Sequence, residues 1–281
     1  MYSTSEQRLG GAGRTETGGK LPYQISIALA AVAGGTSAAS FFFWGVFHRD
    51  TPMGVGNMRG TALAMLAMAV PLVIISMISA SRGSLRARFV WLGALAYIAY
   101  NALLFCFGAH FNSYFLLFAA VLALSFWALV TLLRATELAA VQKASSRVPT
   151  RTVAVYLLVI LVLFAAMWLR DIMPATINNT TPASFEGTGL TQNPIYVLDF
   201  AFTFPLLAIA AVWLWQRRAW GYVLGGTMLI MLTLETAGIA IDQTFGHLHD
   251  PAQSLGAVPI MAAFTGIGTV FSVLFLRGVH D

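Results

Sequence analysis

The chain has 281 residues, of which 58% are hydrophobic and only 10% are charged, and its mean hydropathy is +0.76. This composition lies far from that of soluble domains and matches an integral membrane protein, so it excludes a soluble globular core. The net charge of +5 does not require a nucleic-acid partner, because membrane topology and attraction to anionic lipid explain the excess of positive residues.

The N-terminal segment differs in composition from the rest of the chain. It begins MYSTSEQRLGGAGRTETGGK, which is polar and rich in glycine and contains no apolar stretch of the kind found in secretory signal peptides. We therefore expect residues 1–22 to form a flexible cytoplasmic tail. The first apolar span is then expected to act as the membrane-targeting signal.

Long apolar stretches occupy most of the remaining sequence. A helix of about 20 apolar residues crosses the hydrocarbon layer of a lipid bilayer. The chain is therefore predicted to be an all-α polytopic integral membrane protein with about eight transmembrane helices. The predicted spans lie near residues 23–47, 61–80, 88–110, 113–134, 152–170, 195–216, 220–243 and 257–277.

Lysine and arginine are distributed unevenly between the predicted loops. Thirteen of the 16 fall in the N-terminal tail, in the loops after the second, fourth and sixth spans, and at the C-terminal end. Only Arg49, Arg59 and Arg170 fall on the other side. Because cytoplasmic loops retain positive residues, we expect a multi-pass protein of the cell membrane with both termini in the cytoplasm.

The two halves of the chain, residues 23–151 and 152–281, share sequence features. FFFWGVFHRDTP near the end of the first span resembles MWLRDIMP near the end of the fifth, and AMAVPLVIIS in the second resembles AFTFPLLAIA in the sixth. Pro71 and Pro205 in the latter pair are expected to kink their helices. Two parallel four-helix repeats with a site between them are one interpretation. Chance similarity between apolar segments is the other, since the spacings do not match residue for residue.

Three polar residues, Asn101, Asp199 and Glu235, lie inside spans that are otherwise apolar. A carboxyl group at this depth costs about 2–3 kcal/mol on insertion scales, so it usually faces a cavity, a proton path or a partner group. At 1.5 Å per residue, Asp199 lies ~9 Å from the outer end of its span and Glu235 ~22 Å from the inner end of the next. Asp242 follows Glu235 by seven residues, on the same helix face and nearer the outer surface.

The sixth and seventh spans are joined by a short turn at residues 216–219, which makes them antiparallel neighbours. We therefore predict that Asp199 and Glu235 face each other within the bundle, with Asp242 above Glu235 and Asn101 close by. These four residues form the predicted site for binding of a substrate or a proton. A structural interpretation stays open, because a buried acid or amide also stabilises packing when it hydrogen-bonds a neighbouring helix.

Other polar residues on the outer side carry weaker signals. His48, His110, His247 and His249 lie in predicted outer loops or at span ends. The last two suit zinc or copper ligation, but their two-residue spacing is not a specific pattern, and no metal or cofactor is assigned. Cys106 is the only cysteine, which excludes an internal disulfide and a Cys-x-x-Cys redox pair.

The longest outer segment, residues 171–196, is rich in proline, threonine, asparagine and glycine and is predicted to be a loop. It connects the two halves of the chain above the expected outer mouth of the site. A lid that carries Glu186 and a plain connector are both open interpretations.

Several reaction classes lack their motifs, because the sequence has no P-loop, no dinucleotide-binding glycine pattern and no Gly-x-Ser-x-Gly elbow. The stretches YNALLFCFGAHFN and NPIYVLDFAF resemble segments of bacterial membrane proteins but indicate no family or activity. We expect a proton-linked secondary transporter or permease for a small solute, with Asp199 and Glu235 as coupling carboxylates and Asn101 as a polar contact in the cavity.

Two other functions stay open. One is an integral-membrane enzyme that acts on a lipid or prenyl substrate from the outer leaflet, with the same carboxylates as general acid and base. The other is a membrane scaffold or a subunit of a complex, without a small-molecule site. The sequence identifies neither the substrate nor the oligomeric state.

Overall fold

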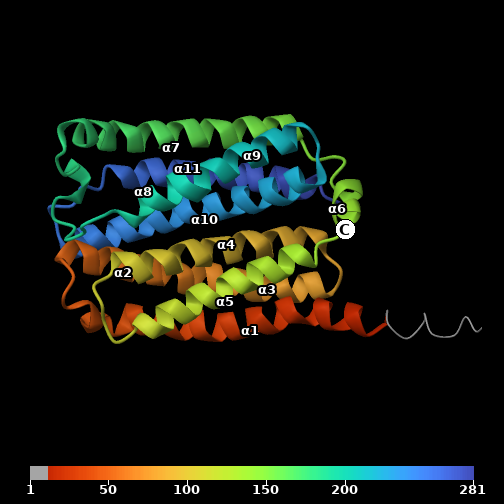
Figure 1. Ribbon diagram of the computed structural model, residues 1–281, viewed down its shortest axis with the longest axis horizontal. Helices are drawn as coiled ribbons and strands as arrows, with labels where there is room; N and C mark the ends of the chain where they lie inside the picture. The colour runs from red at the N-terminus through yellow and green to blue at the C-terminus, as the bar shows by residue number, and fades with distance from the viewer. Residues whose placement is uncertain (1–11) are drawn as a thin grey trace, which may run out of the picture.

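The computed structural model describes the backbone of residues 12–281 and the side chains of residues 19–281. In this part of the chain the structure is helical, and eight helical segments are long and apolar enough to cross a membrane. They lie along one another in an elongated bundle (Figure 1). The predicted architecture of a polytopic all-α membrane protein is confirmed.

Six spans are single α-helices, and they are α1 (Ala12–Phe42), α4 (Leu85–Gly108), α5 (Phe115–Arg134), α7 (Thr150–Asn178), α10 (Ala219–His249) and α11 (Ala257–Arg277). The second span consists of α2 (Pro52–Ala64), η2 (Met65–Ala69) and α3 (Val70–Ser81). The sixth consists of α8 (Pro194–Leu198), η4 (Asp199–Thr203) and α9 (Phe204–Trp215). The short elements outside the spans are η1 (Trp44–Phe47), α6 (Leu138–Ala144) and η3 (Ala183–Phe185).

The second and sixth spans each contain a π-helical turn at the same position relative to a proline. In both, the residue directly before the proline, Pro71 or Pro205, donates its N–H to the carbonyl five residues earlier. The ring of a proline collides with the carbonyl four residues back, and a widened turn before the proline relieves this collision. The two prolines expected to kink their helices thus each directly follow a π-turn. The halves share this feature, while their relationship as repeats stays a hypothesis.

The first span is shifted relative to its predicted bounds. α1 begins at Ala12, so residues 12–22 of the predicted tail are helical, while the expected flexibility of the tail stays a prediction. Extending a helix from an existing span costs much less than nucleating one, so polar residues can continue it. Residues 1–11, the rest of that predicted tail, lie outside the described residues. At the other end α1 stops at Phe42, before the predicted residue 47, and η1 follows.

The second span begins earlier than the predicted residue 61. The side-chain oxygen of Thr51 accepts the N–H of Gly54 at 3.2 Å and caps α2, and Pro52 occupies the first helical position, which needs no N–H. Hydropathy missed this start because the first turns of α2 contain glycines and Arg59. Their helical conformation is stabilised by packing against α10.

The connection between the two halves is shorter than the predicted loop at residues 171–196. α7 continues through Pro174 to Asn178, and Asn179 ends it in the left-handed conformation with φ of 52°. The loop that remains covers residues 179–193 and contains only the short helix η3.

Two glycines bring α2 and α10 into close contact. A Cβ atom on Gly56 would overlap the backbone of Phe245, and one on Gly60 would overlap the backbone of Asp242. Their four-residue spacing places both glycines on one face of α2. Small residues of this kind let membrane helices approach until their backbones are in van der Waals contact. The contact fixes Asp242 against the second span.

The two ends of the bundle differ in composition and packing. At the end that carries most of the arginines, Phe89 of α4 and Phe275 of α11 meet edge to face with ring centroids 5.2 Å apart. Both rings fill the position that a Cβ on Gly226 would take. We call this the arginine-rich end. The opposite end, where Asp50 and the loop 179–193 lie, is called the Asp50 end, and the larger of the two cavities described below lies there.

Candidate functional site

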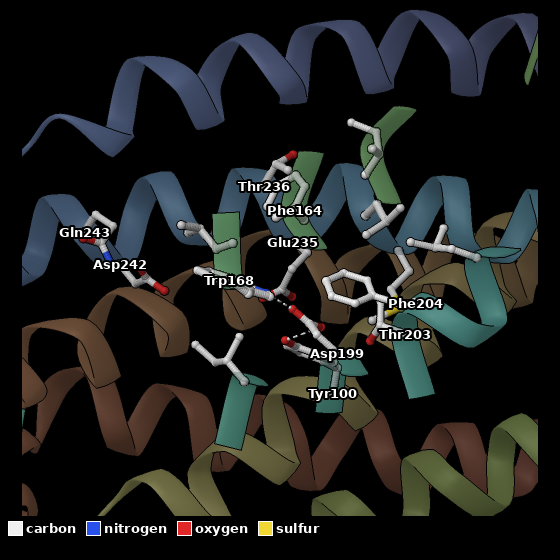
Figure 2. A pocket seen from close by; sticks show the side chains of 16 residues that line it. Tyr100, Phe164, Trp168, Asp199, Thr203, Phe204, Glu235, Thr236, Asp242 and Gln243 are labelled. Carbon is white, nitrogen blue, oxygen red and sulfur yellow. Dashed lines mark hydrogen bonds between the residues drawn. The ribbon is translucent and has the colours of Figure 1, made fainter. Parts of the chain in front are cut away.

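A cavity of about 130 Å³ lies in the middle of the bundle between α7, the sixth span and α10. Figure 2 shows the carboxyl groups of Asp199 and Glu235 pointing into this region from different helices. We call it the inner cavity. Most of its remaining lining is apolar, and the largest of these side chains are Phe164, Trp168 and Phe204.

Asp199 is the first residue of the π-turn η4 and is only 7% exposed. The hydroxyl of Tyr100 donates to its Oδ1 at 3.1 Å, and Nε1–H of Trp168 donates to its Oδ2 at 2.7 Å. Both bonds are visible in Figure 2. Each carboxyl oxygen therefore has an uncharged donor. A carboxyl group buried in this way has no cationic side chain to neutralise it, so its charge changes only by proton transfer or by binding of a cation.

Glu235 reaches the inner cavity from α10 and is held by Asn101. The side-chain amide of Asn101 donates to Oε2 of Glu235 at 2.8 Å and to the carbonyl of Tyr97, one turn back on α4, at 3.1 Å. Asn101 is buried and lies close to Glu235, as predicted, but it is not among the residues that line the cavity, so its role as a polar cavity contact stays a prediction. Its amide is instead occupied by these two acceptors and positions Glu235.

Consecutive residues of α4 thus hold the two acids. Tyr100 bonds Asp199 and Asn101 bonds Glu235, because neighbouring residues on an α-helix point about 100° apart and reach different helices. The two acids line one cavity, as the short turn between the sixth and seventh spans predicted. No direct hydrogen bond joins their carboxyl groups in the described structure.

Asp242 lies two turns beyond Glu235 on α10, toward the Asp50 end. The hydroxyl of Thr61 approaches its Oδ2 at 3.5 Å, while its Oδ1 is buried and has no hydrogen-bond partner among the described residues. Asp242 borders the inner cavity and also a second, larger one. It therefore lies between the deeper acids and the surface loops.

The second cavity has a volume of about 480 Å³ and lies at the Asp50 end. We call it the vestibule. The residues that line both the vestibule and the inner cavity are Ile195, Asp242 and Gln243. The polar residues of the vestibule are Asp50, Asn57, Thr61, Ser184, Thr188, Asn193, Asp242, Gln243, Gln253 and Ser254. The two cavities thus adjoin each other, with these three residues between the vestibule and the part of the inner cavity that Asp199 and Glu235 line.

The loop 179–193 contributes to the vestibule and is fixed near its middle. Ser184 donates to the carboxylate of Asp171, and the hydroxyl of Tyr196 donates to the same carboxylate oxygen at 2.7 Å. Asp171 thereby anchors the loop to α7 and α8. Glu186, the residue considered for a lid, is exposed and does not line the vestibule.

The histidines of the Asp50 end have separate partners. His110 Nδ1 lies 2.8 Å from Oδ1 of Asp50, while His249 Nε2 lies 3.1 Å from Nη1 of Arg59. His247 Nδ1 lies 2.8 Å from the carbonyl oxygen of Gln253. In the part of the chain that the structure describes, no group of three or more His, Cys, Asp or Glu residues is suited to hold a metal ion.

Sequence reasoning missed several polar residues of the site, among them Tyr100, Trp168, Asp50 and Gln253. Tyr100 directly precedes Asn101, and Trp168 belongs to the MWLRDIMP segment, which resembles a segment of the first half. Each of these positions was a weak indication in the sequence that the residue belongs to the site. Asp50 and Gln253 lie in connecting segments, where acids and amides are common and depth in the membrane gives no information.

Comparison of the chain with models of protein families, with curated proteins and with solved structures found no match.

Proposed function

We propose that the protein is a proton-linked secondary transporter or permease for a small solute. Asp199 and Glu235 are the groups that exchange protons, and Asp242 lies on the route between them and the vestibule. The observation that carries the proposal is the pair of adjoining cavities among eight membrane-length helices, the inner one lined by these two acids. Ionisable residues at such depth usually belong to ion, proton or substrate pathways.

The position of the vestibule supports this proposal. The vestibule lies at the Asp50 end and adjoins the inner cavity, while Phe89 and Phe275 close the packing around Gly226 at the arginine-rich end. A transporter with alternating access has one state in which the central site communicates with a single side. With the arginine-rich end placed in the cytoplasm by the positive-inside rule, this state is open toward the outside.

The π-turns supply positions at which the spans can bend. Asp199 itself begins η4, and η2 lies at the matching position in the second span. Widened turns inside α-helices are frequent at functional sites because their hydrogen bonding is less regular. A change in the hydrogen bonding of η4 would move Asp199 relative to its donors Tyr100 and Trp168.

The proposal is tested with purified protein in liposomes that contain a pH-sensitive dye. Candidate solutes are added outside, and proton movement that depends on both solute and protein is recorded. Replacing Asp199 by Asn and Glu235 by Gln should abolish the coupled proton movement. Glu186→Gln is the matched control, because it removes an exposed acid at the same end. Unchanged proton movement in both cavity variants would rule out the coupling role.

An enzyme that acts on a lipid or prenyl substrate is the second candidate, and the apolar lining of the inner cavity favours it. Ile160, Phe164, Leu207 and Met231 surround the two acids and suit a hydrocarbon chain. Conversion of a lipid by detergent-solubilised protein without a membrane gradient would support the enzyme. Counterflow of a solute across the liposome membrane would support transport.

A further inference from the structure

Three buried oxygen atoms that belong to residues lining the vestibule have no hydrogen-bond partner in the described part of the chain. They are Oδ2 of Asp50, Oδ1 of Asp242 and Oε1 of Gln253, and all three residues line this cavity. The Asp50 side chain is only 6% exposed. A buried acceptor without a donor costs roughly 1–3 kcal/mol. A ligand in the vestibule would remove this cost where its hydrogen-bond donors reach these atoms through a small side-chain rotation.

The orientation of two of these acceptors is fixed by their other contacts. Oδ1 of Asp50 accepts from the backbone N–H of His110 at 2.9 Å and lies 2.8 Å from its Nδ1, which leaves Oδ2 free. The amide nitrogen of Gln253 donates to Asn57 at 3.2 Å and to Gln243 at 2.7 Å. Both of its donor hydrogens are used, so its remaining group is the carbonyl oxygen.

A glycine on α10 makes room for this arrangement. A Cβ atom on Gly246 would overlap Oε1 of Gln253 and Oδ1 of Asn57. The glycine therefore allows two amide side chains to pack directly on the helix backbone, one turn from Asp242. The acceptors of Gln253 and Asp242 are thus brought to neighbouring turns of the same helix face.

The charge of the two cavities favours a cation. Their linings contain the four acids Asp50, Asp199, Glu235 and Asp242, and none of the described residues that line them is a lysine, arginine or histidine. Water screens charges weakly inside a protein, so each of these carboxyl groups strongly attracts a cation and repels an anion whenever it is ionised. A neutral solute would satisfy the acceptors but would gain nothing from these charges.

We propose that the solute is a small organic cation with N–H donors, a protonated amine, which binds in the vestibule in exchange for protons of the cavity carboxyl groups. An ammonium group offers three donors and no acceptor, which complements a lining with free acceptors. A volume of about 480 Å³ accommodates a molecule of several carbon atoms, and Met53, Met58 and Leu104 provide apolar contacts for its chain. The binding site stands by itself, while the exchange across the membrane rests on the proposed function.

The exchange balances in charge. One ammonium group enters the adjoining cavities and brings one positive charge, and one carboxyl group there releases one proton to the solution. The carboxylate and the ammonium group then form a pair, and the net charge of the site is unchanged. If this step runs backward on the other side of the membrane, amine and protons cross the membrane in opposite directions.

The binding step is tested by isothermal titration calorimetry of the detergent-solubilised full chain with three compounds that share a four-carbon chain. They are 1,4-diaminobutane, 1,4-butanediol and succinate, which are cationic, neutral and anionic at neutral pH. We expect binding of the diamine only, with heats that differ between phosphate and Tris buffers because protons are released. Equal binding of the diol, or preference for succinate, would overturn the proposed solute class, and so would equal heats in the two buffers.

Two variants test whether the amine binds in the vestibule. Asp50→Asn and Asp242→Asn should each weaken diamine binding about tenfold or more, since each removes a charged acceptor. Glu186→Gln should bind the diamine as the parent does. Size-exclusion chromatography shows whether each variant is folded, and the comparison of the three compounds on the parent protein needs no variant. Unchanged affinity in both folded cavity variants would refute the site.

Failure of the amine proposal and failure of the transport proposal give different results. If the diamine binds as described but liposomes show no diamine-dependent proton movement, the binding site stands and the exchange of amine for protons is refuted. If the diamine does not bind but another solute moves protons through Glu235, the transporter stands and the solute class is wrong.

Discussion

Asn101 of α4 and Glu235 of α10 are joined by a hydrogen bond of 2.8 Å across 134 positions of sequence. The amide donates to the acid and is itself fixed by a bond to its own helix at the carbonyl of Tyr97. Glu235 is therefore held toward the inner cavity by a partner that the cavity does not contact. A substitution at Glu235 is therefore the most informative test of the site.

Glu235→Gln should separate the proton-binding role of this residue from its structural role. Glutamine has the same shape and its carbonyl oxygen still accepts the Asn101 bond, so the helices should remain packed. It cannot bind or release a proton, so solute-dependent proton movement in liposomes should fall to the level of protein-free liposomes. Retained proton movement in a folded variant would remove Glu235 from the proposed pathway.

Trp168→Phe and Tyr100→Phe should each lower solute-dependent proton movement by about tenfold, because a hydrogen bond to a charged acceptor contributes about 1.5–3 kcal/mol. Each substitution removes one donor to Asp199 and keeps the aromatic ring. Trp127→Phe on α5 is the control, since Trp127 is 55% exposed and lines neither cavity. An equal loss in the control would show that the effect is general.

Gly60→Ala should destabilise the bundle by about 1–3 kcal/mol, as overpacking in a close contact does. The new Cβ would overlap the backbone of Asp242, so α2 and α10 would have to move apart. Gly35→Ala is the matched control, because a Cβ on that helical glycine meets nothing within 4 Å. The measurement is the temperature at which half of each protein remains monodisperse in detergent. Equal temperatures for Gly60→Ala and the parent would contradict the close contact.

The orientation is tested with single cysteines placed at the two ends of the bundle. In a Cys106→Ser background, Glu186→Cys should react with a membrane-impermeant maleimide on intact cells. Lys143→Cys should react only after the cells are permeabilised, because the positive-inside rule places the arginine-rich end in the cytoplasm. Both positions are exposed in the structure, so access to solvent does not differ between them. The reverse labelling pattern would invert the proposed topology.

Local properties of the sequence were sufficient to predict the membrane architecture. Hydropathy summed over about 20 residues identifies a span whatever its neighbours are, because the bilayer acts on each helix separately. The same reasoning singled out Asp199 and Glu235, since a carboxyl group within such a span is costly wherever the helix lies. The short turn between the sixth and seventh spans then indicated that the two acids are neighbours.

The tertiary structure alone decided how these residues are used. Asn101 lies behind Glu235 and not in the cavity, and α2 starts early, because each depends on a helix that is distant in sequence. The vestibule combines Asp50 and Gln253 from two connecting segments with Asp242 from a span. A cavity is the space that helix faces leave unfilled when they meet, so no property of a single segment determines it.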